Sequence, residues 1–352
     1  MEHELRQKIP IMYYTIWDDL PYPRWNEPFY ESCDLLMCIS KQTYGIVNNV
    51  IRDYPKDDWA ISYVPHGIHE DRYFPIDSFH SDWKDFENYK KSLVGDSDFV
   101  IYWTNRNIRR KNPGDLVLAY KLFCDTLTKE QSKKCCLLMH TSAVDPNGTD
   151  LHAVVKEICP EYKVVIDEAK VDDRHMNFLY NIGDITVNIA SNEGFGLSGA
   201  ESLMCGTPII NNITGGLQDH CGFELKGKRL TADDYIEIGS LHDDRKWANN
   251  PDLTWGDWVK PVWPSNRAMV GSPPTPYIFD DRCRFDDVAE TIKEWYDMDA
   301  DAREEAGAKG REFVLDPETG MSCKNMSKNF ITNIDTCFEK FESRKRFTLF
   351  EV

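Results

Sequence analysis

Residues 184–211 read DITVNIASNEGFGLSGAESLMCGTPIIN, and this stretch contains a complete strand–loop–helix–strand unit. The apolar run 184–190 predicts a buried strand, the segment 199–205 predicts a short helix, and PIIN at 208–211 predicts the next strand. Two strands joined through a helix lie parallel in one sheet, so this stretch by itself indicates an α/β fold.

The same alternation continues on the amino-terminal side of this unit. Further strands are predicted at 99–103, 135–139 and 164–166, and helices at 113–125, 149–158 and 173–182. Strands that alternate with helices predict a parallel, doubly wound sheet, which binds its ligands at the carboxyl ends of the strands.

Residues 9–75 contain the strands of another α/β unit. The runs IPIMYYT, DLLMCIS and 61–64 are apolar, but no glycine-rich turn follows the first of them. A complete domain of this kind takes roughly 100–150 residues, so the amino-terminal unit is predicted to be shortened. Three accounts remain open: a truncated reading frame, a naturally reduced domain, or a partner chain that supplies the missing half.

The chain is therefore predicted to have two unequal parts. We place a partial N-terminal α/β domain at 1–80 and a Rossmann-like domain at 81–325, followed by a helix at 326–352 that packs back on the N-terminal domain. The segment 221–280 breaks the α/β alternation with tryptophans, prolines and glycines, and we predict an ordered surface insertion there. The end of the chain, 285–345, is predicted to be mostly helical.

Composition narrows the class of protein. The chain has 352 residues, 41% of them hydrophobic, and 41 basic against 59 acidic residues give a net charge of −18. Such a field repels phosphate backbones and anionic lipids, so we expect no nucleic-acid partner. The eleven cysteines lack the spacing of a metal site. No apolar run is long enough to span a membrane, and the first ten residues, MEHELRQKIP, lack the hydrophobic core of a secretion signal. We therefore expect a cytoplasmic location.

The loop at 193–201 admits two interpretations. Its glycines form the pattern G-x-G-x-x-G, which is the fingerprint of dinucleotide-binding domains. In those domains the fingerprint lies in the first βαβ unit, and the strand that follows it ends in an acidic residue. Here the loop follows a late strand, and the next strand ends in two asparagines. Alternatively, Glu201 binds a ribose diol, the glycine amides bind phosphates, and Glu193 faces the group beyond them. That arrangement describes a nucleotide-sugar.

The longer segment 191–216 resembles the E-x7-E region of retaining glycosyltransferases of the family-4 type, which have the GT-B fold. Glu193, the Gly-Phe-Gly sequence, Glu201 in a helix, Gly-x-Pro and Gly-Gly occur in the family's order. The resemblance implies that Glu201 binds the donor ribose and Glu193 contacts the transferred sugar. It also implies that the amides of Phe195, Gly196 and Leu197 contact the sugar or phosphates. Read alone, residues 198–201 (SGAE) also form a capping box, in which Glu201 only closes a helix end.

A basic cluster follows the strand at 99–103. The sequence TNRNIRRKNPGD places Arg106, Arg109, Arg110 and Lys111 before a predicted helix, where cations oppose the helix dipole unless an anion is bound. The resemblance matches Arg106 and Lys111 to the family's phosphate-binding Arg and Lys, which stabilise the departing nucleoside diphosphate. Arg109 and Arg110 are assigned to the surface.

The resemblance implies an α/β, GT-B-like fold with a complete C-terminal donor domain and a truncated N-terminal domain. It implies transfer of a hexosyl group from a UDP- or GDP-sugar to a hydroxyl of a glycan, lipid-linked or other acceptor, with retention of configuration. Glu193, Arg106 and Lys111 are the predicted catalytic residues, and no metal or cofactor is expected. The pair Asp18-Asp19 lacks further ligands for a metal. The alternatives are a non-catalytic nucleotide-sugar-binding module, one half of a two-chain transferase and, more weakly, a nicotinamide enzyme.

Overall fold

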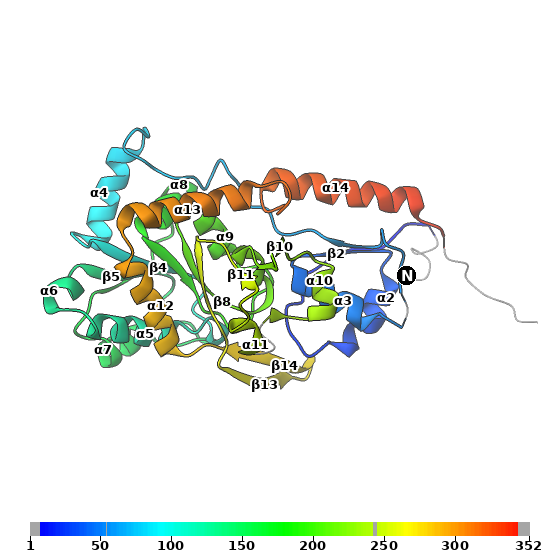
Figure 1. The fold of residues 1–352 in the computed structure, drawn as a ribbon, viewed down its shortest axis with the longest axis horizontal. Helices are drawn as coiled ribbons and strands as arrows, with labels where there is room; N and C mark the ends of the chain where they lie inside the picture. Colours follow the sequence, from blue (N-terminus) through cyan, green and yellow to red (C-terminus); the bar gives the residue numbers. More distant parts are fainter. Residues whose placement is uncertain (1–7, 54, 242–244, 344–352) are drawn as a thin grey trace, which may run out of the picture.

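The computed structural model describes residues 8–53, 55–241 and 245–343. The molecule is elongated, and each of its two halves contains a parallel β-sheet (Figure 1). The smaller sheet has the order β1-β2-β3 and is formed by β1 (Met12–Thr15), β2 (Leu35–Cys38) and β3 (Ile61–Tyr63). The connections between its strands contain α2 (Glu27–Ser32) and α3 (Lys41–Val50).

The packing of strand β2 explains why its sequence is an uninterrupted apolar run. Leu36 and Cys38 pack on α3, whereas Leu35 and Met37 pack on the opposite face against the C-terminal helix α14 (Cys323–Lys340). A strand covered on both faces cannot alternate apolar and polar residues. The central strand of the small sheet is therefore covered on both faces, whereas Tyr13 on the edge strand β1 is exposed.

The larger sheet has six parallel strands in the order β12-β8-β7-β4-β5-β6. They are β4 (Phe99–Thr104), β5 (Cys135–His140), β6 (Val164–Asp167), β7 (Ile185–Asn188), β8 (Ile209–Asn212) and β12 (Val259–Val262). Its helices include α4 (Trp83–Val94), α5 (Pro113–Asp125), α6 (Lys129–Ser132), α7 (Leu151–Ile158), α8 (Asp173–Ile182) and α9 (Leu197–Met204). The strands and helices predicted between 99 and 211 agree with these bounds to within about three residues.

The order of the strands locates a switch point. The chain enters the sheet at β4, continues outward through β5 and β6, and then returns to the other side of β4 with β7, β8 and β12. The loops after β4 and β7 therefore diverge next to each other and open a crevice at the carboxyl edge.

The segment 221–280 is partly inside the sheet. Val259–Val262 forms its edge strand, although Pro261 lies within it, because an edge strand tolerates the missing amide. The remainder holds the short elements β9 (Glu224–Leu225), β10 (Lys228–Arg229), α10 (Asp234–Ile238), α11 (Arg245–Ala248) and β11 (Leu253–Thr254). A hairpin of β13 (Asn266–Ser272) and β14 (Thr275–Arg282) follows, which the sequence analysis did not predict.

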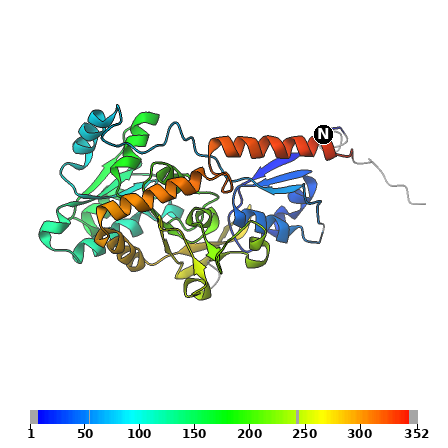
Figure 2. The same cartoon turned by 45° about the horizontal axis from the view of Figure 1, so that its top comes forward.

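The C-terminal helices connect the two halves. After α12 (Phe285–Asp297), α13 (Ala300–Leu315) packs on α9, and α14 continues across to cover the small sheet (Figures 1 and 2). The chain crosses between the halves twice, and the crossings are hydrogen-bonded at Ile68, whose amide donates to Met321 O at 2.8 Å. The part of the predicted terminal helix at 344–352 lies outside the described residues.

The eleven cysteines all lie in the described part of the chain and form no disulfide there, and ten of them are buried. Among the residues that the structure describes, no helix has both the length and the apolar character that a bilayer crossing requires.

Candidate functional site

A cavity of about 2040 Å³ lies between the two halves. One wall comes from the loops that follow β4, β5 and β7, and the other comes from the loops that follow β1, β2 and β3. The β13–β14 hairpin also lines the cavity and forms hydrogen bonds to both halves, to Ser191 O and to Leu20 O. The carboxyl ends of both sheets therefore face the same space, and the switch point of the larger sheet opens into it.

The glycine loop after β7 is shaped by one residue. Gly196 has φ +88° and directly precedes α9, so a side chain there would be strained, and a Cβ would lie 2.4 Å from Leu217 Cδ2. The first amides of α9, at Leu197 and Ser198, have no carbonyl one turn earlier to bind, and both residues line the cavity. These amides and the helix dipole suit an anion.

The capping-box interpretation of Glu201 is wrong. Ser198 lies inside the helix and its hydroxyl is 3.3 Å from Asn188 Nδ2, while Gly196 occupies the N-cap position. The Glu201 carboxylate accepts hydrogen bonds from Tyr180 and Tyr73 instead. Burial raises the pKa of Glu201, and the two tyrosines oppose that shift.

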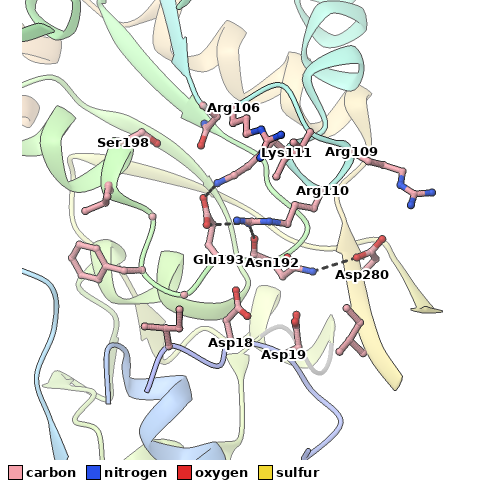
Figure 3. A pocket seen from close by; sticks show the side chains of 18 of the residues that line it. Asp18, Asp19, Arg106, Arg109, Arg110, Lys111, Asn192, Glu193, Ser198 and Asp280 are labelled. Atoms are coloured by element: carbon pink, nitrogen blue, oxygen red, sulfur yellow. Dashed lines mark hydrogen bonds and ion pairs between the residues drawn. The ribbon is translucent and has the colours of Figure 1, made fainter. Parts of the chain in front are cut away.

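Glu193 is the centre of the basic wall. Its side chain is 9% exposed, and it accepts hydrogen bonds from Lys111 Nζ through Oε1 and from Arg110 Nη1 through Oε2, the latter at 3.1 Å (Figure 3). Burial alone would raise the pKa of Glu193, but the two cations outweigh it and hold that pKa below its usual range. Burial lowers the pKa of Lys111, and Glu193 counters this shift.

The assignment of Arg110 to the surface holds only in part, because its side chain is 39% exposed but also lines the cavity. Its guanidinium binds both the Glu193 carboxylate and Asn192 O, the latter at 2.6 Å, whereas Arg109 is exposed and points away (Figure 3). The 3₁₀ turn η2 (Arg109–Lys111) sends consecutive side chains in different directions. Asn112 then adopts φ +51° and donates from Nδ2 to Ile189 O at 2.9 Å, which joins the β4 loop to the β7 loop.

Arg106 lies at the rim of the cavity. Its side chain is 63% exposed and forms an ion pair with Asp145, with Nε 2.8 Å from Oδ2. Of the two predicted cations, the structure therefore brings Lys111 to Glu193 and leaves Arg106 near the entrance. Phe195 is buried under the loop, where its ring lies edge-on to His220.

Asp18 and Asp19 face Glu193 and Asn192 from the other half of the molecule (Figure 3). Burial raises the pKa of Asp18 to about 6, with Glu193 adding to the shift and Arg110 opposing it. Burial together with Asp18 raises the pKa of Asp19 to about 9. The sequence analysis considered this pair only as a metal ligand, because nothing local showed that β1 ends opposite β7. Within the described ranges, no group of three or more His, Cys, Asp or Glu residues is arranged to hold a metal ion.

The elevated pKa of Asp19 predicts that Asp19→Asn stabilises the protein. The ordinary value is 3.8, and burial, Asp18, Asp281 and Asp280 all raise it. The folded state therefore binds the proton of Asp19 more tightly than the unfolded chain does. The stabilising contribution of protonated Asp19 to the free energy of unfolding is fully present below about pH 4 and is lost as the pH rises toward 9. We expect a higher melting temperature for the variant at pH 8 and a difference that shrinks toward pH 4, measured by scanning calorimetry. A difference that does not change with pH would contradict this, and Glu130→Gln on exposed α6 is the matched control.

Comparison with solved structures identifies the architecture. Neither a family model nor a curated protein matches the chain. Anabaena HepE in complex with UDP and glucose is similar at a TM-score of 0.62 with 11% identity, over 93% of this chain and 72% of that one. Sucrose-phosphate synthase from Thermosynechococcus elongatus is similar at a TM-score of 0.61 with 16% sequence identity, over 96% of this chain and 70% of that one. A glycosyltransferase from Rickettsia africae is similar at a TM-score of 0.61 with 15% sequence identity, over 94% of this chain and 71% of that one. The chain therefore has the predicted GT-B fold, with a shortened N-terminal part.

Proposed function

We propose that this GT-B chain is a glycosyltransferase that moves a hexosyl group from a UDP- or GDP-sugar to a hydroxyl acceptor with retention of configuration. The observation that carries the proposal is the cluster of the buried Glu193 and Lys111 with the partly exposed Arg110 at the switch point of the larger sheet. It lies on the same cavity wall as the first turn of α9 and Glu201. The presence of UDP and glucose in the complex of HepE supports a nucleotide-sugar as the donor.

The donor diphosphate fits the basic wall. The amides at the start of α9 and the ammonium of Lys111 would receive its oxygens, and Arg106 at the rim would reach it from solvent. In the free protein the Glu193 carboxylate pairs with the Lys111 ammonium, so the buried positive charge of Lys111 is compensated before the donor binds. A bound diphosphate would take over as the anion beside Lys111.

The ribose of the donor would bind at Glu201. A carboxylate offers about four lone-pair directions, and the Tyr180 and Tyr73 hydroxyls use two of them. The remaining directions can accept hydrogen bonds from a vicinal diol. Tyr73 belongs to the segment between the two halves, and its ring lies edge-on to that of Tyr180 in α8, with the centroids 5.7 Å apart.

Transfer breaks the bond between the anomeric carbon and the diphosphate oxygen and forms a bond to the acceptor oxygen on the same face. Lys111, Arg110 and Arg106 stabilise the negative charge that develops on the leaving diphosphate. Glu193 holds the sugar and stabilises positive charge on the ring, and the proton of the acceptor hydroxyl passes to the departing phosphate. These steps use no metal or other cofactor.

The proposal is tested by titrating the protein with UDP, GDP and NAD in a calorimeter and then following donor turnover by NMR. We expect saturable binding of UDP or GDP, no binding of NAD, and a product with the anomeric configuration of the donor. An inverted product would contradict the retaining mechanism, and binding of NAD alone would contradict the donor site.

The ribose role of Glu201 predicts a selective loss in Glu201→Ala. We expect UDP binding to weaken by about 1.5–3 kcal/mol, the value of a charge-assisted hydrogen bond. Wild-type protein should discriminate against 2′-deoxy-UDP, and the variant should bind both nucleotides equally. Tyr180→Phe, which retains the carboxylate, should keep the discrimination. Unchanged discrimination in Glu201→Ala would show that the ribose lies elsewhere.

A second candidate is a nucleotide-sugar-binding module without activity of its own, or one half of a two-chain transferase. It is favoured by the small N-terminal sheet, which has three strands, and by the 70–72% of each of the three similar structures that the chain spans. Transfer by the purified chain alone would exclude both versions. Binding of UDP without turnover, restored by a second chain, would support the two-chain version.

A further inference from the structure

The predicted insertion at 221–280 has no part in the proposed reaction, yet two of its elements lie against the small half. It contains α10, and it continues into the β13–β14 hairpin, which ends at Arg282. Both elements belong to the large half, because β12 of the large sheet lies between them in the chain. The segment 221–282 therefore joins the large half to the small half without being a crossing of the chain.

Strand β14 is hydrogen-bonded to both halves through one edge. The Phe279 amide donates to Leu20 O at 2.7 Å, and the Asp281 amide donates to Ser191 O at 3.0 Å. Leu20 belongs to the loop after β1, and Ser191 belongs to the loop after β7. Amides two residues apart on a strand point to the same side and lie about 7 Å apart. One strand edge therefore sets the spacing of the two cavity walls at this point.

The hairpin is fixed to the large half at Asp281. This residue is 3% exposed, and its carbonyl accepts a hydrogen bond from Asn212 Nδ2 at 2.8 Å, at the end of β8. Its carboxylate accepts from Thr214 Oγ1 at 2.9 Å and pairs with Arg267 Nε at 2.7 Å. The end of β14 therefore follows the large sheet in any movement of the two halves.

The hairpin is fixed to the small half by aromatic side chains. Phe279 packs on the core of the small half, which includes Leu20. The Tyr277 ring lies edge-on to Trp25 with the centroids 4.3 Å apart, and the Tyr277 hydroxyl donates to Tyr22 O at 3.3 Å. Edge-on aromatic pairs contribute more than the area that they bury. This end of β14 therefore follows the small half.

Helix α10 makes a second contact with the small half, at α3. Asn49 Nδ2 donates to Ile236 O at 2.8 Å. One turn earlier in α3, a Cβ on Gly45 would lie 2.4 Å from Tyr235 O, so the two backbones touch where the glycine lacks a side chain. The segment 221–282 therefore fastens the small half at two separate places.

Two halves that are joined only by chain crossings are expected to hinge, and closure around a ligand is a common form of that motion. Here the crossings lie beside α14, whereas the hairpin lies at the opposite edge of the molecule (Figure 1). Fastenings on both sides of a cavity oppose such a hinge motion. We propose that the segment 221–282 is a strap that fixes the separation of the two halves before any ligand binds. The cavity is then preassembled and does not need to close on the donor.

The first test compares hydrogen exchange at the amides of Phe279 and Asp281 in the ligand-free protein, followed by NMR. We expect both amides to be protected in the native chain. The strap variant, Trp25→Ala combined with Tyr277→Ala, should speed exchange at Phe279 by about tenfold or more and leave Asp281 protected, because only the small-half end is loosened. Rapid exchange at Phe279 in the native chain, or no difference between the two amides in the variant, would overturn the proposal.

The matched control is Phe79→Ala. It also removes an aromatic ring, but the Phe79 side chain is 96% exposed. We expect the exchange of both amides to remain as in the native protein. Acceleration at Phe279 as large as in the strap variant would contradict the proposed anchor.

The second test measures the separation of the halves by double electron–electron resonance. Spin labels are attached to non-natural amino acids at Glu31 in α2 and Glu290 in α12, both of which are exposed. We expect a narrow distance distribution that shifts by less than about 2 Å when UDP is added. The strap variant should broaden the distribution, and Asn49→Ala added to it should broaden it further. A larger shift with UDP, or equal widths in all three proteins, would overturn the proposal.

The inference goes beyond the proposed function, because it concerns contacts within the chain and holds for any ligand of the cavity. The exchange rates and the ligand-free distance distributions are measured without UDP. If UDP fails to bind, the donor proposal fails while the strap is still tested. If UDP binds and the halves close on it, only the strap proposal fails.

Discussion

Replacing Glu193 by glutamine is expected to abolish sugar transfer while UDP binding is retained or becomes tighter. In the free protein the carboxylate competes with any phosphate for Lys111 and Arg110, because it is hydrogen-bonded to both. Glutamine keeps the size and one acceptor but removes the negative charge, so both cations become available to the diphosphate. The transferred sugar loses the group that stabilises its developing positive charge, and we expect turnover to fall by about 100-fold or more.

The measurement is a pair of experiments on one preparation, UDP titration by calorimetry and transfer followed by NMR. Thermal melting in the presence of UDP shows that the variant is folded, which matters because Glu193 partners a buried lysine. Removal of one charge from a buried ion pair costs about 3–5 kcal/mol. Glutamine also leaves Lys111 without its counter-charge, but unlike alanine it keeps a hydrogen-bond acceptor beside the ammonium and leaves no cavity. A parallel loss of UDP affinity and turnover would mean that Glu193 acts mainly by positioning Lys111.

Replacing Lys111 by methionine is expected to cause the largest loss of donor binding. The ammonium is buried at the point where the β4 loop meets Glu193, and no other lysine lies among the described lining residues of the cavity. Loss of one charge-assisted hydrogen bond to phosphate costs about 1.5–3 kcal/mol, or about 10- to 150-fold in affinity. Turnover should fall further, since the charge on the departing diphosphate exceeds that of the bound donor.

Arg109→Met is the matched control for Lys111→Met. It removes a cation two residues away on the same turn, but the Arg109 side chain is exposed and points away from Glu193 (Figure 3). We expect UDP affinity and turnover close to those of the native protein. If Arg109→Met weakens UDP binding as strongly as Lys111→Met does, UDP affinity depends on the overall charge of the loop. The position of the Lys111 ammonium beside Glu193 would then not explain the loss of affinity.

The strands of the large sheet could be predicted because burial on both faces leaves a continuous apolar run. FVIYW at 99–103 and CCLLM at 135–139 match β4 and β5 closely for this reason. The edge strand β12 was not predicted, since Val259–Val262 contains a proline and is flanked by tryptophans. The β13–β14 hairpin was also missed, because it is half exposed and therefore lacks a continuous apolar run.

The sequence placed Glu193, Lys111 and Glu201 in loops or helix starts that follow predicted strands, which is the edge where a parallel sheet binds its ligands, but it did not show that the strands before the two loops are neighbours. The sequence alone therefore determined the α/β alternation, the glycine loop and the presence of residue types that suit a diphosphate. Each of these features depends only on residues close together in the chain. Tertiary structure decided that Arg110 turns inward while Arg109 turns out, that Tyr180 and Tyr73 hold Glu201, and that Asp18 and Asp19 face Glu193 across the cavity. These contacts depend on the direction of side chains, and most of them join segments more than 80 residues apart, such as those of Arg110 and Glu193. Chain folding brings these segments together, and no local pattern encodes their contacts.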